Sequence, residues 1–446
     1  MSNDCTLWPP STVRGIKVLD RSLFTKLVKI PFAKIPTKSI GRIAGAPLMK
    51  QWTIERMNRI KPIMEADTKE EKLILFNPDT FTDEVKNSVR NSFKELLELD
   101  PEFGTKEFTL TYEDWDLKRC LDAIFDENTR ISSFTQIGHI AHLNLRDEAL
   151  AYKNVLAQIL FDKLPKVKTV VNKLDKINSN FRFFEMELLA GEPEYITEIK
   201  EFGLTYRLDF SKVFWNSRLS NEHHRIVEKL DRDCVVFDVF AGIGPFALPA
   251  IKKLVAKVFA NDLNPTSIEY LKENIKLNKI DPQRIETYNL DGAQFIREII
   301  SEKLTMYLKE DSCDSLKFHV LMNLPALAVT FLPNFKGILD GKIEMLSHKL
   351  NFFVHCYTFI KATEEKPMSW FEEQAILNVR CSLDLPNLQM AEVHHVRTVS
   401  NLKEMFCLTF ELPFDYFLSS VNNSMKRQID TENQHEVKEK VPKLDS

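Results

Sequence analysis

The chain has 446 residues, 44% of them hydrophobic, so it is long enough for two or three domains with substantial cores. No apolar run approaches the length of a membrane span, and we expect no association with a membrane. The seven cysteines are scattered without a Cys-x-x-Cys pair. This pattern indicates neither a disulfide framework nor a zinc or other metal site, and it favours a reducing compartment.

Charge is distributed unevenly along the chain. Residues 1–60 hold eleven Lys and Arg against three acids, a net of +8, so the net of −4 for the whole chain leaves −12 for the remainder. A basic N-terminal arm on an acidic body can serve RNA binding. A solvated surface or a targeting segment explains the same charges, and composition alone does not separate these interpretations.

Two smaller α+β domains are predicted before the main domain. In residues 1–128, strands are expected at 72–76 and 106–112, with helices from about 83 to 99 and from 114 to 125. In residues 129–218, strands are expected at 137–145, 167–171, 182–189 and 206–209, with a helix at 147–164. His139 and His142 would face opposite sides of a strand, which makes them a poor metal-binding pair.

Residues 219–415 show a strand, a glycine turn and a helix, followed by further strands at the spacing of a strand and a helix. Residues 234–239 form a buried strand that ends at Asp238, and Gly242 and Gly244 follow in the turn. Three further strand ends carry polar residues, namely Asp262, Asp291 and Asn323 with Pro325. Four such ends line one crevice in a parallel sheet, and Phe246 stands where a pyrophosphate contact would begin, so we expect a nucleotide-type ligand without a pyrophosphate.

The last part of the chain completes this domain. Strands at 351–359, 390–398 and 404–412 and a helix at 370–383 predict a seven-stranded sheet with a reversed final strand. The tail, residues 416–446 of the predicted division, is polar and charged without periodicity and is expected to be disordered.

The motifs Asp238-Val-Phe-Ala-Gly-Ile-Gly-Pro-Phe246, Asn261-Asp-Leu-Asn-Pro265, Asp291-Gly292 and Asn323-Leu-Pro325 resemble those of class I S-adenosylmethionine methyltransferases. Together with 182–192 and 206–222 they resemble the archaeal and eukaryotic tRNA (guanine-37-N1)-methyltransferase family, over roughly residues 9–413. The resemblance implies a Rossmann-like α/β core and a tRNA substrate. It implies methyl transfer from S-adenosyl-L-methionine to N1 of guanosine 37, which is also the first step towards wybutosine in tRNA-Phe.

The resemblance also assigns roles to residues. Glu222 would be the base that takes the N1 proton, Arg182 would stabilise charge on O6, and Asn323 and Pro325 would shape the floor under the guanine. From the residues alone, Glu222 is better explained as an acid at a helix N-terminus, and it is the resemblance that favours catalysis. The residues implied for cofactor binding are His223, Asp238, Ala241, Gly242, Gly244, Asp262, Leu263, Asp291, Gly292 and Asn323.

Two positions depart from the family pattern: Ser217 stands where Pro is usual, and Phe214 where Tyr is frequent. Both lie in the loop before Arg218 and affect the expected RNA contacts of that loop. Two alternative functions stay open, a 3-amino-3-carboxypropyl transferase of wybutosine synthesis and a non-catalytic tRNA-binding protein. The family resemblance implies a monomer and a location in the cytoplasm, nucleus and mitochondrial matrix.

Overall fold

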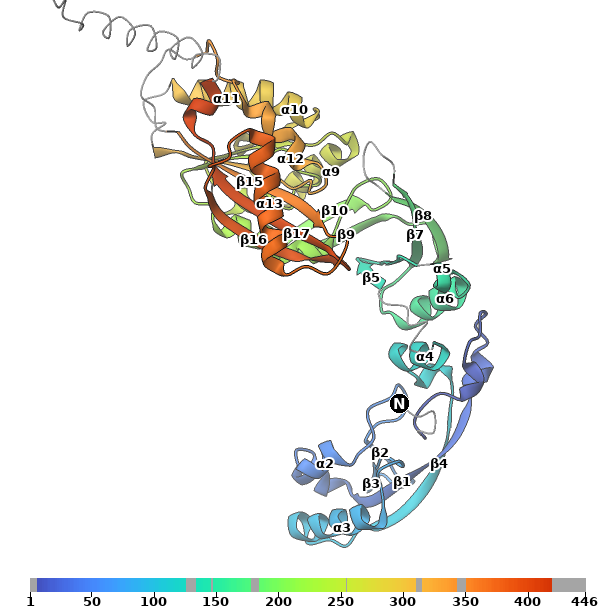
Figure 1. Cartoon of the computed structure of the whole chain (residues 1–446). Coiled ribbons are helices and arrows are strands. Elements are labelled where there is room, and N and C mark those ends of the chain that lie inside the picture. The colour runs from blue at the N-terminus through green and yellow to red at the C-terminus, as the bar shows by residue number, and fades with distance from the viewer. Residues whose placement is uncertain are drawn as a thin grey trace, which may run out of the picture. The chain divides into compact units, whose positions relative to one another are not determined.

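The computed structural model describes residues 6–125, 134–145, 147–177, 184–253, 255–309, 315–342 and 350–418. The chain forms two compact units (Figure 1). The first comprises residues 1–176 and 185–195, and the second comprises residues 177–184 and 196–446.

The second unit is built on a seven-stranded sheet with the order β13-β12-β11-β14-β15-β17-β16. All neighbours from β13 to β15 are parallel, and β17 runs antiparallel to both β15 and β16. The prediction of seven strands with a reversed final strand is confirmed. The strands are β11 (Cys234–Asp238), β12 (Lys257–Asn261), β13 (Ile285–Tyr288), β14 (Lys317–Met322), β15 (Asn351–Lys361), β16 (Met390–Ser400) and β17 (Lys403–Glu411).

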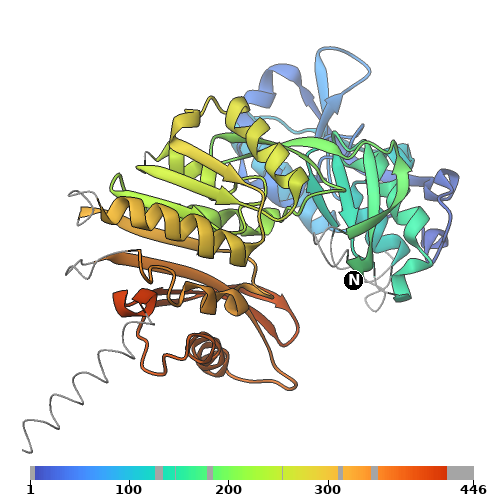
Figure 2. The same cartoon turned by 90° about the horizontal axis from the view of Figure 1, so that it is seen from above.

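Helices cover both faces of this sheet (Figures 1 and 2). On one face, Val235, Phe237 and Phe352 share an apolar core with residues of the π-helix η7 (Phe295–Ile300), α11 (Ser301–Leu308), α12 (Ala328–Phe331) and α13 (Met368–Leu383). The short helix α10 (Gly292–Gln294) directly precedes η7. Since side chains alternate along a strand, Val236 faces the other side. That side carries α7 (Ser220–Glu228), α8 (Ala247–Lys252) and α9 (Pro265–Leu277).

A hairpin of β9 (Ile196–Glu201) and β10 (Leu204–Asp209) is fastened to α9 by two asparagines. Asn274 accepts a hydrogen bond from the backbone N–H of Arg207 at 2.8 Å and donates to its carbonyl oxygen at 3.1 Å. Asn278 makes the same pair of bonds with Thr205, at 2.9 and 2.7 Å. The side-chain amides of Asn274 and Asn278 lie one helical turn apart. They therefore bind alternate residues of β10, through both the N–H and the carbonyl oxygen, as the backbone of a neighbouring strand would.

The first unit holds two four-stranded sheets with the orders β2-β3-β1-β4 and β5-β6-β7-β8. One apolar core includes Phe24, Leu75 and Trp115 together with Leu143 and Leu160, and so joins elements of both sheets. The strands are β1 (Lys26–Pro36), β2 (Ile63–Glu65), β3 (Glu71–Leu75), β4 (Glu102–Leu110), β5 (Phe134–Ile137), β6 (Ile140–Leu143), β7 (Thr169–Ile177) and β8 (Phe184–Gly191). The helices are α1 (Ile40–Ile43), α2 (Pro47–Gln51), α3 (Asp83–Leu97), α4 (Leu117–Ile124), α5 (Asp147–Leu150) and α6 (Lys153–Lys163).

Several local predictions for this part of the chain were wrong. No strand was predicted in residues 26–36, but β1 lies there between β3 and β4 and buries Ile30, Ala33 and Ile35. The strand expected at 137–145 is the hairpin β5–β6, which turns at Gly138 with a φ of 56°. The expected helix at 147–164 is split into α5 and α6.

The strand β9 was not anticipated, and its hairpin with β10 belongs to the second unit, although the sequence assigned residues up to 218 to a middle domain. The division into three domains and a tail stays a prediction. Most of the tail, from residue 419 onward, lies outside the described residues.

Candidate active site

The loop after β11 forms one wall of the candidate site. Asp238 ends the strand, and the amide of Ala241 donates to the carbonyl oxygen of Asn261 on the neighbouring strand at 2.7 Å. Gly242 and Gly244 have φ angles of 54° and 101°, in the region that favours glycine. A Cβ on Gly244 would lie 2.6 Å from Leu271, whereas one on Gly242 would meet nothing within 4 Å. The loop is therefore tightly packed at Gly244 and open to a ligand at Gly242.

Asp262, after β12, holds this loop in place. Its Oδ2 accepts from the amide of Gly242 and its Oδ1 from the amide of Asn264, both at 2.8 Å. Burial raises the pKa of Asp262, although the two amide donors oppose that effect. Each carboxylate oxygen has a second lone pair, so Asp262 can also accept hydrogen bonds from a ligand. The next residue, Leu263, exposes 46% of its surface and can cover an apolar part of the same ligand.

Asp238 is fully buried, and within the described part of the chain neither of its carboxylate oxygens has a hydrogen-bond partner in good geometry. Burial, and then the charge of Asp262, raise its pKa well above the usual value, while the Phe240 amide acts weakly in the other direction. Asn323, at the end of the neighbouring strand β14, likewise has a buried Oδ1 without a partner in that part of the chain. Unsatisfied buried polar groups are costly, so the two residues fit a polar, positively charged ligand at this edge.

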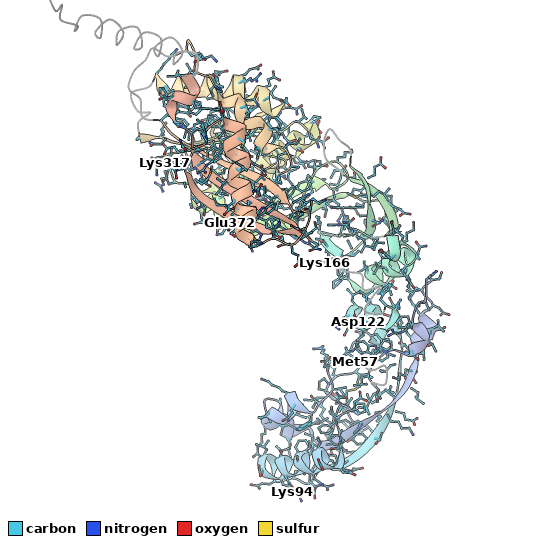
Figure 3. The ribbon with its side chains drawn as sticks, in the orientation of Figure 1. Met57, Lys94, Asp122, Lys166, Lys317 and Glu372 are labelled. Atoms are coloured by element: carbon cyan, nitrogen blue, oxygen red, sulfur yellow. The ribbon has the colours of Figure 1, made fainter. Side chains whose placement is uncertain are left out.

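The remaining strand ends complete the edge. Asp291 is exposed and caps α10 through Oδ1, which accepts from the Ala293 amide at 2.8 Å. A Cβ on Gly292 would lie 2.8 Å from the ring of Phe240, so the strand ends after β11 and β13 pack closely. Pro325 accepts a hydrogen bond from the Phe359 amide at 2.9 Å. Lys317, which Figure 3 labels, marks the opposite, amino-terminal end of β14.

Glu222 lies in the first turn of α7 and is 5% exposed. Arg225, one turn further on, donates Nε to Oε2 and Nη2 to Oε1, both at 2.7 Å. Tyr357 on β15 donates its hydroxyl to Oε1 at 2.7 Å, and His394 Nε2 on β16 lies 3.4 Å from Oε2. Burial raises the pKa of Tyr357, so it remains a neutral donor. Glu222 is thus buried and held by more side chains than a charge at a helix end needs.

One aromatic side chain connects Glu222 to the glycine loop. Phe246, two residues after Gly244, lies 4.8 Å from the ring of His223 and 6.1 Å from that of Tyr357. His223 follows Glu222 and pairs through Nδ1 with Glu201 at 2.7 Å, and both side chains are buried. The carboxylate and the ligand edge therefore belong to one packed cluster.

The structure adds residues that the sequence reasoning missed, namely Glu201, Arg225, Tyr357 and His394. Arg225 could have been found from its spacing to Glu222 on a helix. The others come from separate strands, and no local pattern marks them.

The remaining predictions have simple outcomes. Arg182 lies outside the described residues. His139 contacts the carbonyl oxygen of Glu194 at 3.1 Å. None of the helices described is both long and apolar enough to cross a membrane.

A seven-stranded α/β sheet with polar residues at the carboxyl ends of its parallel strands defines a protein of the Rossmann-like class, in which ligands bind at that edge. The fold is similar to the crystal structure of Trm5b from Pyrococcus abyssi, with a TM-score of 0.58, 23% identity, and coverage of 86% of this chain and 99% of that one. Residues 197–382 match the TRM5/TYW2 methyltransferase domain and residues 117–194 the TYW2 N-terminal domain.

Curated relatives cover nearly the whole chain. The tRNA (guanine(37)-N(1))-methyltransferase of Caenorhabditis elegans is 36% identical over 471 residues, covering 100% of this chain and 98% of that protein. The Homo sapiens protein of the same name is 40% identical over 407 residues, covering 91% and 78%. The chain belongs to the tRNA (guanine(37)-N(1))-methyltransferase family.

Proposed function

We propose that this protein transfers a methyl group from S-adenosyl-L-methionine to N1 of guanosine 37 in tRNA, giving 1-methylguanosine. The observation that carries the proposal is the buried, triply held Glu222, in contact through Phe246 with a ligand edge, in a chain that resembles these enzymes over most of its length. In tRNA-Phe the same product is the first step towards wybutosine.

The residues at the edge suit the parts of the cofactor. Asp262 would accept from the ribose hydroxyls, Asp291 from the adenine amino group, and Asp238 would pair with the ammonium of the methionine end. The open side of Gly242 lets that end approach the backbone from Ala241 to Gly244. Leu263, His223 and Gly292 would line the pocket. When bound, the cofactor supplies an activated methyl group.

The chain's own residues handle the proton. Guanine N1 carries a proton at neutral pH, so its methylation needs a base, and charge that develops on O6 needs stabilisation. Glu222 is the base in this proposal, with Asn323 and Pro325 under the guanine and Arg182 at O6. The buried Oδ1 of Asn323 is an acceptor free to bind an N–H of the base.

The proposal extends to the rest of the molecule. Residues 1–128 and 129–218 form two smaller α+β domains, the first of which contacts tRNA, and the protein acts as a monomer. By family resemblance it works in the cytoplasm, nucleus and mitochondrial matrix.

The second candidate is the 3-amino-3-carboxypropyl transferase of wybutosine synthesis, to which the name TYW2 refers. One matching family model carries this name together with TRM5, and the other carries it alone. The two activities are separated by incubating unmodified tRNA transcripts with cofactor and measuring the mass gain of the modified nucleoside. A gain of one methyl group at guanosine 37 supports our proposal. A larger group, or no transfer at all, contradicts it.

The role of Glu222 is tested by Glu222→Gln. We expect single-turnover methyl transfer to fall by roughly 10²–10⁴, the usual contribution of a general base, while cofactor and tRNA binding persist. The matched control is Glu392→Gln, because Glu392 is the other carboxylate bound to Arg225, at 2.8 Å. A Glu222→Gln rate near wild type would assign the base to another group.

A further inference from the structure

The hydrogen bonds to Glu222 leave one direction open for proton exchange. A carboxylate offers about two lone pairs on each oxygen. Oε1 already accepts from Tyr357 and from Arg225 Nη2, and Oε2 accepts from Arg225 Nε. Oε2 therefore keeps one lone pair, and Nε2 of His394 lies 3.4 Å from this atom. The geometry therefore singles out Oε2 as the atom that gains and loses a proton.

Exposure makes His394 the route from this atom to water. The Glu222 side chain is 4% exposed and that of His394 is 36% exposed, on the edge strand β16. Tyr357 is fully buried, and a guanidinium such as Arg225 does not give up its proton in a protein. Of the described groups that contact Glu222, His394 is thus the one that can accept a proton and pass it to solvent.

The surroundings keep the imidazole neutral. Burial, and then the charge of Arg225, lower the pKa of His394 below its usual value, while Glu222 and Glu392 act in the opposite direction and His395 adds to the lowering. His395, the next residue, pairs instead with Glu404 on β17, Nε2 to Oε2 at 2.7 Å. Two adjacent histidines on one strand therefore have different partners, and one of them contacts the candidate base.

We propose that His394 carries the proton from Glu222 to solvent after each methyl transfer. This inference rests on the proposed function. The proton that N1 loses in exchange for the methyl group passes to Oε2 of Glu222. The resulting carboxylic acid gives it to Nε2 of His394, and the imidazolium releases a proton to water. The carboxylate and the neutral imidazole are then restored, and one proton reaches solvent for each methyl group transferred.

The test compares His394→Ala and His394→Asn with the matched control His395→Ala, using the full chain and excess unmodified tRNA transcript. The first turnover of the His394 variants should stay close to wild type, because His394 acts in this proposal only after Glu222 has taken the proton from N1. Later turnovers should slow by roughly 100-fold, the lower end of the contribution of a positioned proton-transfer group. Added imidazole should restore the later turnovers of His394→Ala, and His395→Ala should need no rescue.

Two outcomes overturn the proposal. If later turnovers are unchanged, the proton leaves by another path. If the first and later turnovers slow equally and imidazole restores neither, His394 only supports the position of Glu222. Failure of the proposed function looks different, because the wild-type protein would then transfer no methyl group to guanosine 37.

Discussion

At the scale of single residues, Asp238 shows a conflict between stability and ligand binding. Its carboxyl is completely buried, near a second carboxyl, and lacks a hydrogen-bond partner in good geometry among the described residues. A buried, uncompensated acid lowers the stability of the folded chain. The same property leaves the carboxylate ready to bind a cation, such as the ammonium of the proposed cofactor.

Asp238→Asn should therefore stabilise the ligand-free protein and weaken cofactor binding. We expect a melting temperature higher by at least about 2–4 °C, the shift that 1 kcal/mol produces in a unit of this size. The affinity for the cofactor should fall by about tenfold or more, as expected for the loss of a charge-assisted hydrogen bond. Calorimetry measures both quantities, and a variant that is less stable yet binds normally would contradict this account.

The stabilisation should also depend on pH. Burial raises the pKa of Asp238, so between the pKa of about 4 for an unfolded Asp and the higher folded value, the folded chain binds more protons than the unfolded chain. This group therefore lowers stability as pH rises through that range. The difference in melting temperature between variant and wild type should grow as pH increases from about 4.

At the scale of elements, the hairpin β9–β10 depends on side chains rather than on strand pairing to the large sheet. Asn274 is completely buried, and each asparagine satisfies one backbone N–H and one carbonyl oxygen of β10. The hairpin in turn carries Glu201, which holds His223 beside the candidate base. The two asparagines thus link α9 to the candidate site.

Asn274→Ala and Asn278→Ala should each cost about 1–3 kcal/mol, because backbone groups of β10 lose their partners. The amides of Thr205 and Arg207 should exchange with deuterium faster than in the wild-type protein, while those of β11 stay protected. Lys276→Ala, at an exposed position of the same helix, is the control. Unchanged exchange at both amides in the double variant would show that other contacts hold the hairpin.

At the scale of the whole molecule, the excess positive charge of residues 1–60 is only partly available to RNA. Lys29 and Lys34 pair with Glu107 and Glu102 of β4, at 3.3 and 2.8 Å. Arg59 binds the buried Asp114. The exposed cations of this segment include Lys38, Arg42 and Lys50. They are the better candidates for phosphate contacts.

Replacing Lys38, Arg42 and Lys50 together by Gln should weaken tRNA binding and reduce the slope of log K against log salt by about 2, because each phosphate contact contributes roughly 0.7–0.9. Cofactor affinity should not change. Lys29→Gln with Lys34→Gln is the matched control, since those charges are already paired. Deleting the first fifty residues is not a usable test, because the deletion removes β1 from its sheet. An unchanged salt slope in the triple variant would favour a solvated surface.

Much of the candidate ligand edge could be predicted from the sequence, because its polar residues lie at or within three residues of the end of a short strand. The surroundings of Glu222 could not. Tyr357 reaches it across a separation of 135 residues, and sheet order alone brings the two together. β1 was missed because Pro36 and the lysines within the strand lower its strand propensity, whereas its burial depends on partners later in the chain. Strand propensity depends on neighbouring residues in the chain, whereas the contacts of β1 and of Glu222 join residues that are far apart in the sequence.

The position of β1 has a consequence for how the protein is made. Its two partners are β3 and β4, so the strand at the centre of this sheet leaves the ribosome before either neighbour exists. Until residue 110 has emerged, the edge of β1 that pairs with β4 stays open and the apolar side chains of Ile30, Ala33 and Ile35 lack their complete cover. During this part of translation β1 is therefore prone to aggregation. If translation stops before β4 has been made, the four-stranded sheet of the first unit cannot form completely.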